Sequence, residues 1–67
     1  MFKFFKRKKE LKIWLLQDIR NNQEIITISD TLGISNRLTY GYERIIKELT
    51  DKEAYNYWLN NDNVILE

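Results

Sequence analysis

The amino-acid sequence predicts a mainly α-helical domain of the α+β class, with three helices and a small β-hairpin at its C-terminal end. Three observations predict this fold class. Apolar residues recur at helical spacing near the N-terminus, at Leu11, Trp14, Leu15 and Ile19. Gly33 separates two segments that each begin with a helix-capping residue type. The last third combines aromatic and β-branched residues with a run of Asn and Asp, which is typical of a hairpin.

Length and composition exclude several classes of protein. The chain has 67 residues and a mass of 8.2 kDa, which is enough for one small domain. It contains no Cys, His or Pro, so a disulfide framework, a Cys/His zinc site and a Cys- or His-based catalytic centre are excluded. No Gly-rich phosphate loop or metal-spaced carboxylate cluster occurs. We therefore expect no enzyme activity, no metal and no cofactor.

The net charge of +1 conceals a division along the chain. Residues 1–12 hold six basic residues against one Glu, which gives +5, whereas residues 13–67 hold five basic and nine acidic residues, which gives −4. We therefore divide the chain into a basic, aromatic arm over residues 1–9 and a domain over residues 10–67. The longest apolar run, within residues 11–16, is too short to cross a bilayer, and no signal-peptide pattern follows the basic start. These features favour the cytoplasm.

The first helix is expected from about Lys8 to Asn21, where a pair of Asn residues favours its end. Ile13 and Leu16 lie outside its main apolar stripe, so the helix is apolar around most of its circumference. Such a helix is usually covered on more than one side. Either the phenylalanines of the arm or another chain would provide the second cover.

The next two helices are expected to flank a turn at Gly33. Thr27 is a suitable N-cap for a short helix over residues 28–32, and Gly33 ends that helix by taking the left-handed conformation. Ser35 then caps a longer helix from Asn36 to about Asp51. A short capped helix, a tight turn and a second capped helix form a helix-turn-helix.

Two further segments have strand-like composition. Residues 24–27, Glu-Ile-Ile-Thr, favour one brief strand. In residues 51–66, a capping-box pattern from Thr50 to Glu53 would open a helix, but the aromatic residues 55–59 and the apolar residues 64–66 favour two strands around a turn. We favour the hairpin and keep the helix as the alternative.

The expected helix from Asn36 has a polar face that suits DNA. Its apolar face contains Leu38, Tyr42, Ile45 and Leu49. The opposite face offers Asn and Arg side chains, which pair bidentately with adenine and guanine, and Lys and Tyr for phosphate contacts. The arm adds sequence-independent attraction to phosphates. The candidate DNA-binding residues are Ser35, Asn36, Arg37, Tyr40, Arg44 and Lys47 on this helix and Lys6, Arg7, Lys8 and Lys9 in the arm.

Residues 24–66 resemble the winged helix-turn-helix domains of bacterial transcription regulators of the DeoR, Mga and catabolite-activator types. The resemblance is carried by the turn Leu32-Gly33-Ile34-Ser35, the helix end Arg44–Leu49, and residues 55–59 and 64–66 at the wing positions. It implies a recognition helix over about residues 36–51 in the major groove and a wing over about residues 55–66 beside the backbone. It also implies a sequence-specific double-stranded DNA-binding protein, either a transcriptional regulator or an excisionase-like architectural factor.

The alternative function is a protein-binding adaptor or inhibitor that uses a helix-turn-helix-like fold without binding DNA. The domain beyond the arm is acidic, and the expected wing tip, residues 60–63, contains no basic residue. A homodimer or a second protein would contact Ile13 and Leu16 of the first helix together with Phe2, Phe4 and Phe5. A membrane-surface anchor formed by the arm is a third interpretation, but we do not expect membrane binding.

Overall fold

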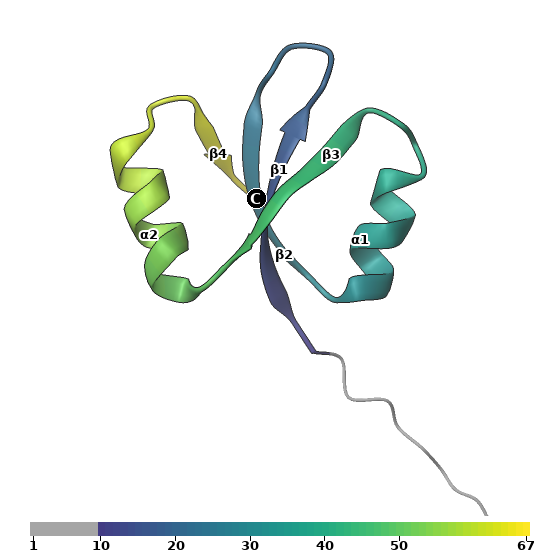
Figure 1. The fold of residues 1–67 in the computed structure, drawn as a ribbon, viewed down its shortest axis with the longest axis horizontal. Helices are drawn as coiled ribbons and strands as arrows, with labels where there is room; N and C mark the ends of the chain where they lie inside the picture. Colours follow the sequence, from purple (N-terminus) through teal and green to yellow (C-terminus); the bar gives the residue numbers. More distant parts are fainter. Residues whose placement is uncertain (1–9) are drawn as a thin grey trace, which may run out of the picture.

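The computed structural model describes residues 10–67, and within them it contains four strands and two helices (Figure 1). The predicted mainly α fold with three helices and a hairpin is therefore wrong. In chain order the elements are β1 (Lys12–Asp18), β2 (Glu24–Ser29), α1 (Thr31–Leu38), β3 (Glu43–Leu49), α2 (Asp51–Asn60) and β4 (Val64–Leu66).

The strands of residues 10–67 form one mixed sheet in the order β3-β1-β2-β4. β1 is antiparallel to β2 and β3, and β2 is parallel to β4, so β1 alone runs against the other three. Each helix connects two parallel strands: α1 leads from β2 to β3, and α2 leads back from β3 to β4. Connections between parallel strands of one sheet are almost always right-handed. The connection through α1 crosses the sheet from β2 to β3, and the connection through α2 crosses it in the opposite direction, from β3 to β4. The two helices therefore lie on opposite faces of the sheet. Figure 1 shows α1 and α2 on the two sides of the sheet.

The expected helix from Lys8 to Asn21 is wrong over the described residues, which form β1 and a turn. β1 is a central strand covered on both faces. Trp14 and Leu16 pack beneath α1, while Ile13 and Leu15 face α2. A strand with both faces buried has a nearly continuous apolar sequence, and this run also matched helical spacing.

Helix α1 begins later than expected and contains the glycine that was expected to end a helix. Asp30 is its N-cap, and its Oδ1 accepts a 2.7 Å hydrogen bond from the Gly33 amide. A Cβ atom at Gly33 would lie 2.3 Å from Ser29 Oγ. Gly33 is thus explained by close approach of the preceding strand. The strand predicted at residues 24–27 is confirmed as part of β2, and Thr27 is buried inside it instead of capping a helix.

The expected recognition helix from Asn36 to Asp51 is wrong. α1 ends at Leu38, Gly41 takes a positive φ of 79° in the turn that follows, and residues 43–49 form the edge strand β3. A glycine in this conformation cannot continue a right-handed helix. The chain therefore turns back along β1, with a register shift opposite Leu15 and Leu16.

The expected hairpin over residues 55–66 is also wrong, and the alternative helix is confirmed. Thr50 Oγ1 accepts from the Glu53 amide at 3.1 Å, and Glu53 Oε1 accepts from the Thr50 amide at 2.9 Å. This capping box satisfies two of the amides that a helix start leaves free and opens α2. β4 is a short edge strand beside β2, so this region forms no wing.

Candidate interaction groove

The structure does not bring the predicted DNA-contacting residues of the domain onto one surface. Ser35 and Asn36 are exposed on α1, and Tyr40 lies in the turn after it. Arg44 is on β3 and donates to Gln17 Oε1 at 2.9 Å. Gln17 lies on the same face of β1 as Ile13 and Leu15, which face α2. Because the Arg44 side chain contacts Gln17, it lies on the face of the sheet opposite α1. The polar helix face on which DNA readout was predicted does not exist in this fold.

Arg37 holds the ends of three segments together. Its Nε and Nη2 donate to the Glu43 carboxylate at 2.6 and 2.9 Å, and its guanidinium also binds Glu67. The hydrogen bonds to Glu43 and then to Glu67 raise the pKa of Arg37 above its usual value, and those from Arg37 lower the pKa of Glu67. The guanidinium that was predicted to contact a base thus joins α1 to the start of β3 and to the residue after β4.

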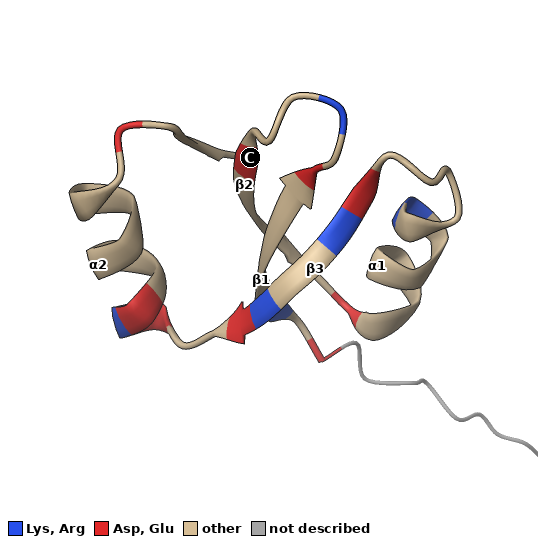
Figure 2. Cartoon of the chain, turned by 45° about the horizontal axis from the view of Figure 1, so that its top comes forward, with Lys and Arg blue, Asp and Glu red and all other residues tan. Residues whose placement is uncertain are grey.

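Other basic residues of the domain lie beside carboxylates. Arg20 forms a 2.8 Å ion pair with Asp18, and its hydrogen bonds lower the pKa of Asp18 to about 2. Lys47 lies 3.7 Å from Glu53. Figure 2 shows acidic residues at both ends of β3 and basic residues between them. Residues 10–67 hold six basic and ten acidic residues, a net charge of −4.

Several predicted contact residues have other positions or lie outside the described part. Leu16 is 0% exposed in the core beneath α1, so it offers no surface to a partner. Ile13 is half-buried on the other face of the sheet. The arm residues lie outside residues 10–67, and they include the predicted contacts Lys6, Arg7, Lys8, Lys9, Phe2, Phe4 and Phe5.

Helix α2 is held to the sheet along one side only. Within the described chain, none of its residues is fully buried, and Ala54 and Tyr57 are the ones that pack on the core. The Tyr57 hydroxyl donates a hydrogen bond to the Glu24 carboxylate. This hydrogen bond and, to a smaller extent, burial of the hydroxyl raise the pKa of Tyr57 to about 12. The neighbouring face of α2, with Tyr55 and Trp58, remains open.

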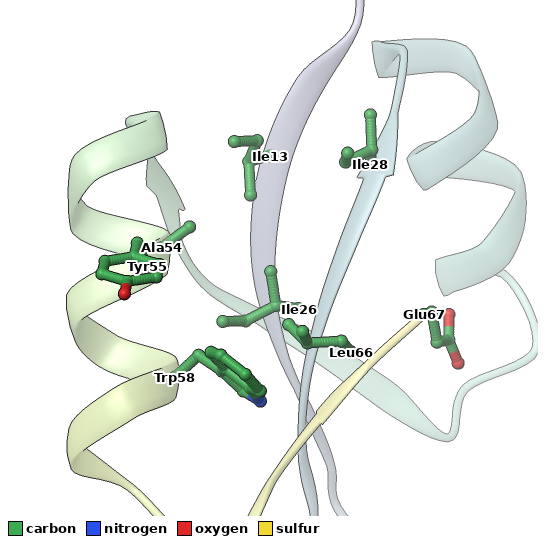
Figure 3. A pocket seen from close by; sticks show the side chains of 8 residues that line it. All are labelled: Ile13, Ile26, Ile28, Ala54, Tyr55, Trp58, Leu66 and Glu67. Atoms are coloured by element: carbon green, nitrogen blue, oxygen red, sulfur yellow. The ribbon is translucent and has the colours of Figure 1, made fainter.

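A mainly apolar groove lies between this open face of α2 and the sheet (Figure 3). Its volume is about 330 Å³, at the lower end of the range of small-molecule pockets. The side chains of Ile28, Tyr55 and Leu66 are each more than half exposed, and Trp58 is 42% exposed. The described residues that line it are Ile13, Ile26, Ile28, Ala54, Tyr55, Trp58, Leu66 and Glu67.

Sequence reasoning missed this groove, although two local signals for it exist. Tyr55 and Trp58 are three residues apart, the spacing of one helix face, and Ile26 and Ile28 are two apart, the spacing of one strand face. The spacing of Tyr55 and Trp58 places them on one face only if residues 55–59 are helical, and the sequence favoured a strand there.

Comparison of the chain with protein families, with curated proteins and with solved structures found no match. The groove and the charge distribution of residues 10–67 are therefore the features that bear on function. Neither helix in residues 10–67 has the length and hydrophobicity that crossing a membrane requires. The same residues contain no group of three acidic side chains placed to hold a metal ion.

Proposed function

We propose that this chain is a small protein-interaction domain whose groove between α2 and the sheet binds an apolar segment that also carries positive charge. The observation that supports it is the exposed apolar lining. Soluble monomers rarely leave large contiguous apolar patches in water, and such patches are typical of interaction sites. Here Ile28, Tyr55, Trp58 and Leu66 form one such surface.

The charge of the domain supports a cationic ligand. Residues 10–67 carry −4, and ion pairs or hydrogen bonds already engage Arg20, Arg37, Arg44 and Lys47. A net negative domain attracts a basic segment and repels an acidic one, which affects association rate and selectivity more than affinity. The apolar lining would then supply the affinity.

A nuclear magnetic resonance titration tests the proposal. The probes are a Leu/Lys nonapeptide and a matched Leu/Glu nonapeptide, each added to the ¹⁵N-labelled full chain. We expect the Leu/Lys peptide to shift the amides of Ile26, Ile28 and Ala54 and the indole of Trp58, and the Leu/Glu peptide to bind more weakly. Trp58→Ala should abolish the shifts, and Tyr40→Ala, which removes an exposed aromatic outside the groove, should preserve them. Shifts centred on α1, or none with either peptide in both the full chain and Phe2→Ser/Phe4→Ser/Phe5→Ser, would refute it.

Double-stranded DNA binding is the second candidate, and the charge of the arm favours it. Residues 1–9 hold five basic and no acidic side chains, a density that releases counterions from a duplex. The test is duplex affinity against salt for the full chain and for Lys6→Ala/Arg7→Ala/Lys8→Ala/Lys9→Ala. A steep salt dependence that the quadruple variant loses supports DNA binding through the arm. If the full chain does not bind duplex DNA even at low salt, DNA binding is excluded.

A further inference from the structure

We propose that the N-terminal segment of the same chain occupies the groove in the absence of a partner, with Phe2, Phe4 and Phe5 placed against Trp58 and the isoleucines of the sheet. The domain would then be self-inhibited, because a partner must displace this segment before it binds. This inference rests on the proposed function, since it needs the groove to accept an apolar, cationic segment.

The described part of the chain begins at Glu10, three residues before Ile13. Ile13, the second residue of β1, lines the groove, and its antiparallel partner on β2 is Ile28. Figure 3 shows β1 entering at the end where these two residues lie, with Trp58 further along. The chain that precedes β1 therefore begins beside the apolar lining.

The segment is also long enough to return along the groove. Phe5 precedes Ile13 by eight residues, which reach roughly 26 Å when extended. The lining from Ile28 to Ile26 covers two residues of a strand, about 7 Å. The spare length allows a reversal of direction with residues 2–5 laid along the groove.

The chemistry of the segment matches that of the groove. Three of its first five residues are Phe, and its charge of +5 opposes the −4 of residues 10–67. Among the described lining residues Glu67 alone is charged, so phenylalanine rings would contact apolar side chains while the lysines stay at the rim. Tethering keeps the segment at an effective concentration on the order of 1 mM, so modest affinity is enough to fill the site.

The exposure of Trp58 reports whether the segment is docked. In the full chain with Trp14→Phe, Trp58 is the single tryptophan. We expect Phe2→Ser/Phe4→Ser/Phe5→Ser to raise its acrylamide quenching constant about twofold, because 42% of the residue is exposed without cover, and to shift its emission to the red. The matched control Lys6→Ser/Lys8→Ser/Lys9→Ser introduces as many serines but keeps the rings, and should change quenching less.

A second reporter separates docking from loss of structure. In the full chain with Trp58→Phe, the remaining Trp14 is 9% exposed beneath α1, on the other face of the sheet. Its quenching should not respond to the Phe→Ser changes. Equal quenching of Trp58 in the parent and the Phe→Ser variant would overturn the proposal. A difference between them that grows with protein concentration would assign the segment to a second copy and also overturn it.

A labelled peptide of residues 1–9 distinguishes failure of this inference from failure of the proposed function. The peptide should bind the Phe→Ser full chain about tenfold more tightly than the parent, if its Kd is about 0.1 mM and the tethered competitor is present at about 1 mM. Equal binding to both chains would overturn docking of the segment and leave the interaction groove supported. Absence of binding to both, with unchanged Trp58 quenching, would overturn both proposals.

Discussion

Arg37→Ala is expected to destabilise the fold, because Arg37 neutralises a carboxylate that has little access to water. The side chain of Glu43 is 13% exposed and that of Arg37 28% exposed. Removing the guanidinium leaves the Glu43 carboxylate without its bidentate partner. Glu67, which is 41% exposed, regains hydration and contributes much less.

The magnitude follows from these exposures. Breaking a buried ion pair by removing one partner costs about 3–5 kcal/mol, whereas an exposed pair contributes about 0–1 kcal/mol. Since Glu43 keeps some contact with water, we expect a loss of about 2–3 kcal/mol. A core of this size supplies only about 3–5 kcal/mol, so the variant would be close to unfolding.

Urea unfolding of the full chain, followed by far-ultraviolet circular dichroism, measures this loss. With a slope of about 1 kcal/mol/M, the midpoint should fall by about 2–3 M. Arg44→Ala is the matched control, because Arg44 is exposed on an edge strand, and its cost should be below about 0.5 kcal/mol. Glu43→Gln should recover part of the loss in the Arg37→Ala background. Equal midpoints for the two Arg variants would mean that the Arg37–Glu43 contact does not stabilise the fold.

Three further predictions concern the turn at Gly41, the N-cap of α2 and the loss of stability at acid pH. Gly41→Ala should cost about 1–2 kcal/mol by urea unfolding, because φ at Gly41 is +79° although nothing lies within 4 Å of the added methyl; an unchanged midpoint would contradict this turn. Thr50→Ala should cost about 1 kcal/mol and lower helicity by circular dichroism, since it removes the cap of α2; full stability would contradict the capping box. The pKa of Asp18 is lowered to about 2 from 3.8, so its stabilisation is complete above about pH 4 and disappears as pH falls towards 2. The urea midpoint should drop over this range and drop less in Asp18→Asn; identical pH profiles would contradict the Arg20 contact.

The wrong element assignments have two physical origins, one tertiary and one local. Residues 11–19 match a helix, and the run Ile13–Leu16 equally matches a strand buried on both faces. The strand forms because α1 and α2 cover its two faces. Both helices come later in the chain, so this cover cannot be recognised from residues 11–19 themselves. The helix predicted over residues 36–51 is wrong for a local reason, because Gly41 takes a positive φ and ends α1's segment before the predicted polar face can form.

Features that depend on a few neighbouring residues could be predicted from the sequence. The strand at residues 24–27 is confirmed, and the capping box from Thr50 to Glu53 forms as its pattern indicates, although the hairpin was favoured over it. The groove could not be predicted, because Ile13, Trp58 and Leu66 meet only through strand order and the seating of α2.

The division of charge, the absence of Cys and His chemistry and the capping box of α2 can be recognised from the sequence alone, since each depends on composition or on contacts within one turn. Which apolar residues form the core and which remain exposed depends on how the strands and helices pack. The pairing of β4 with β2 joins residues about forty positions apart, and burial depends on such distant pairings. For that reason Leu16 became core and Trp58 became surface.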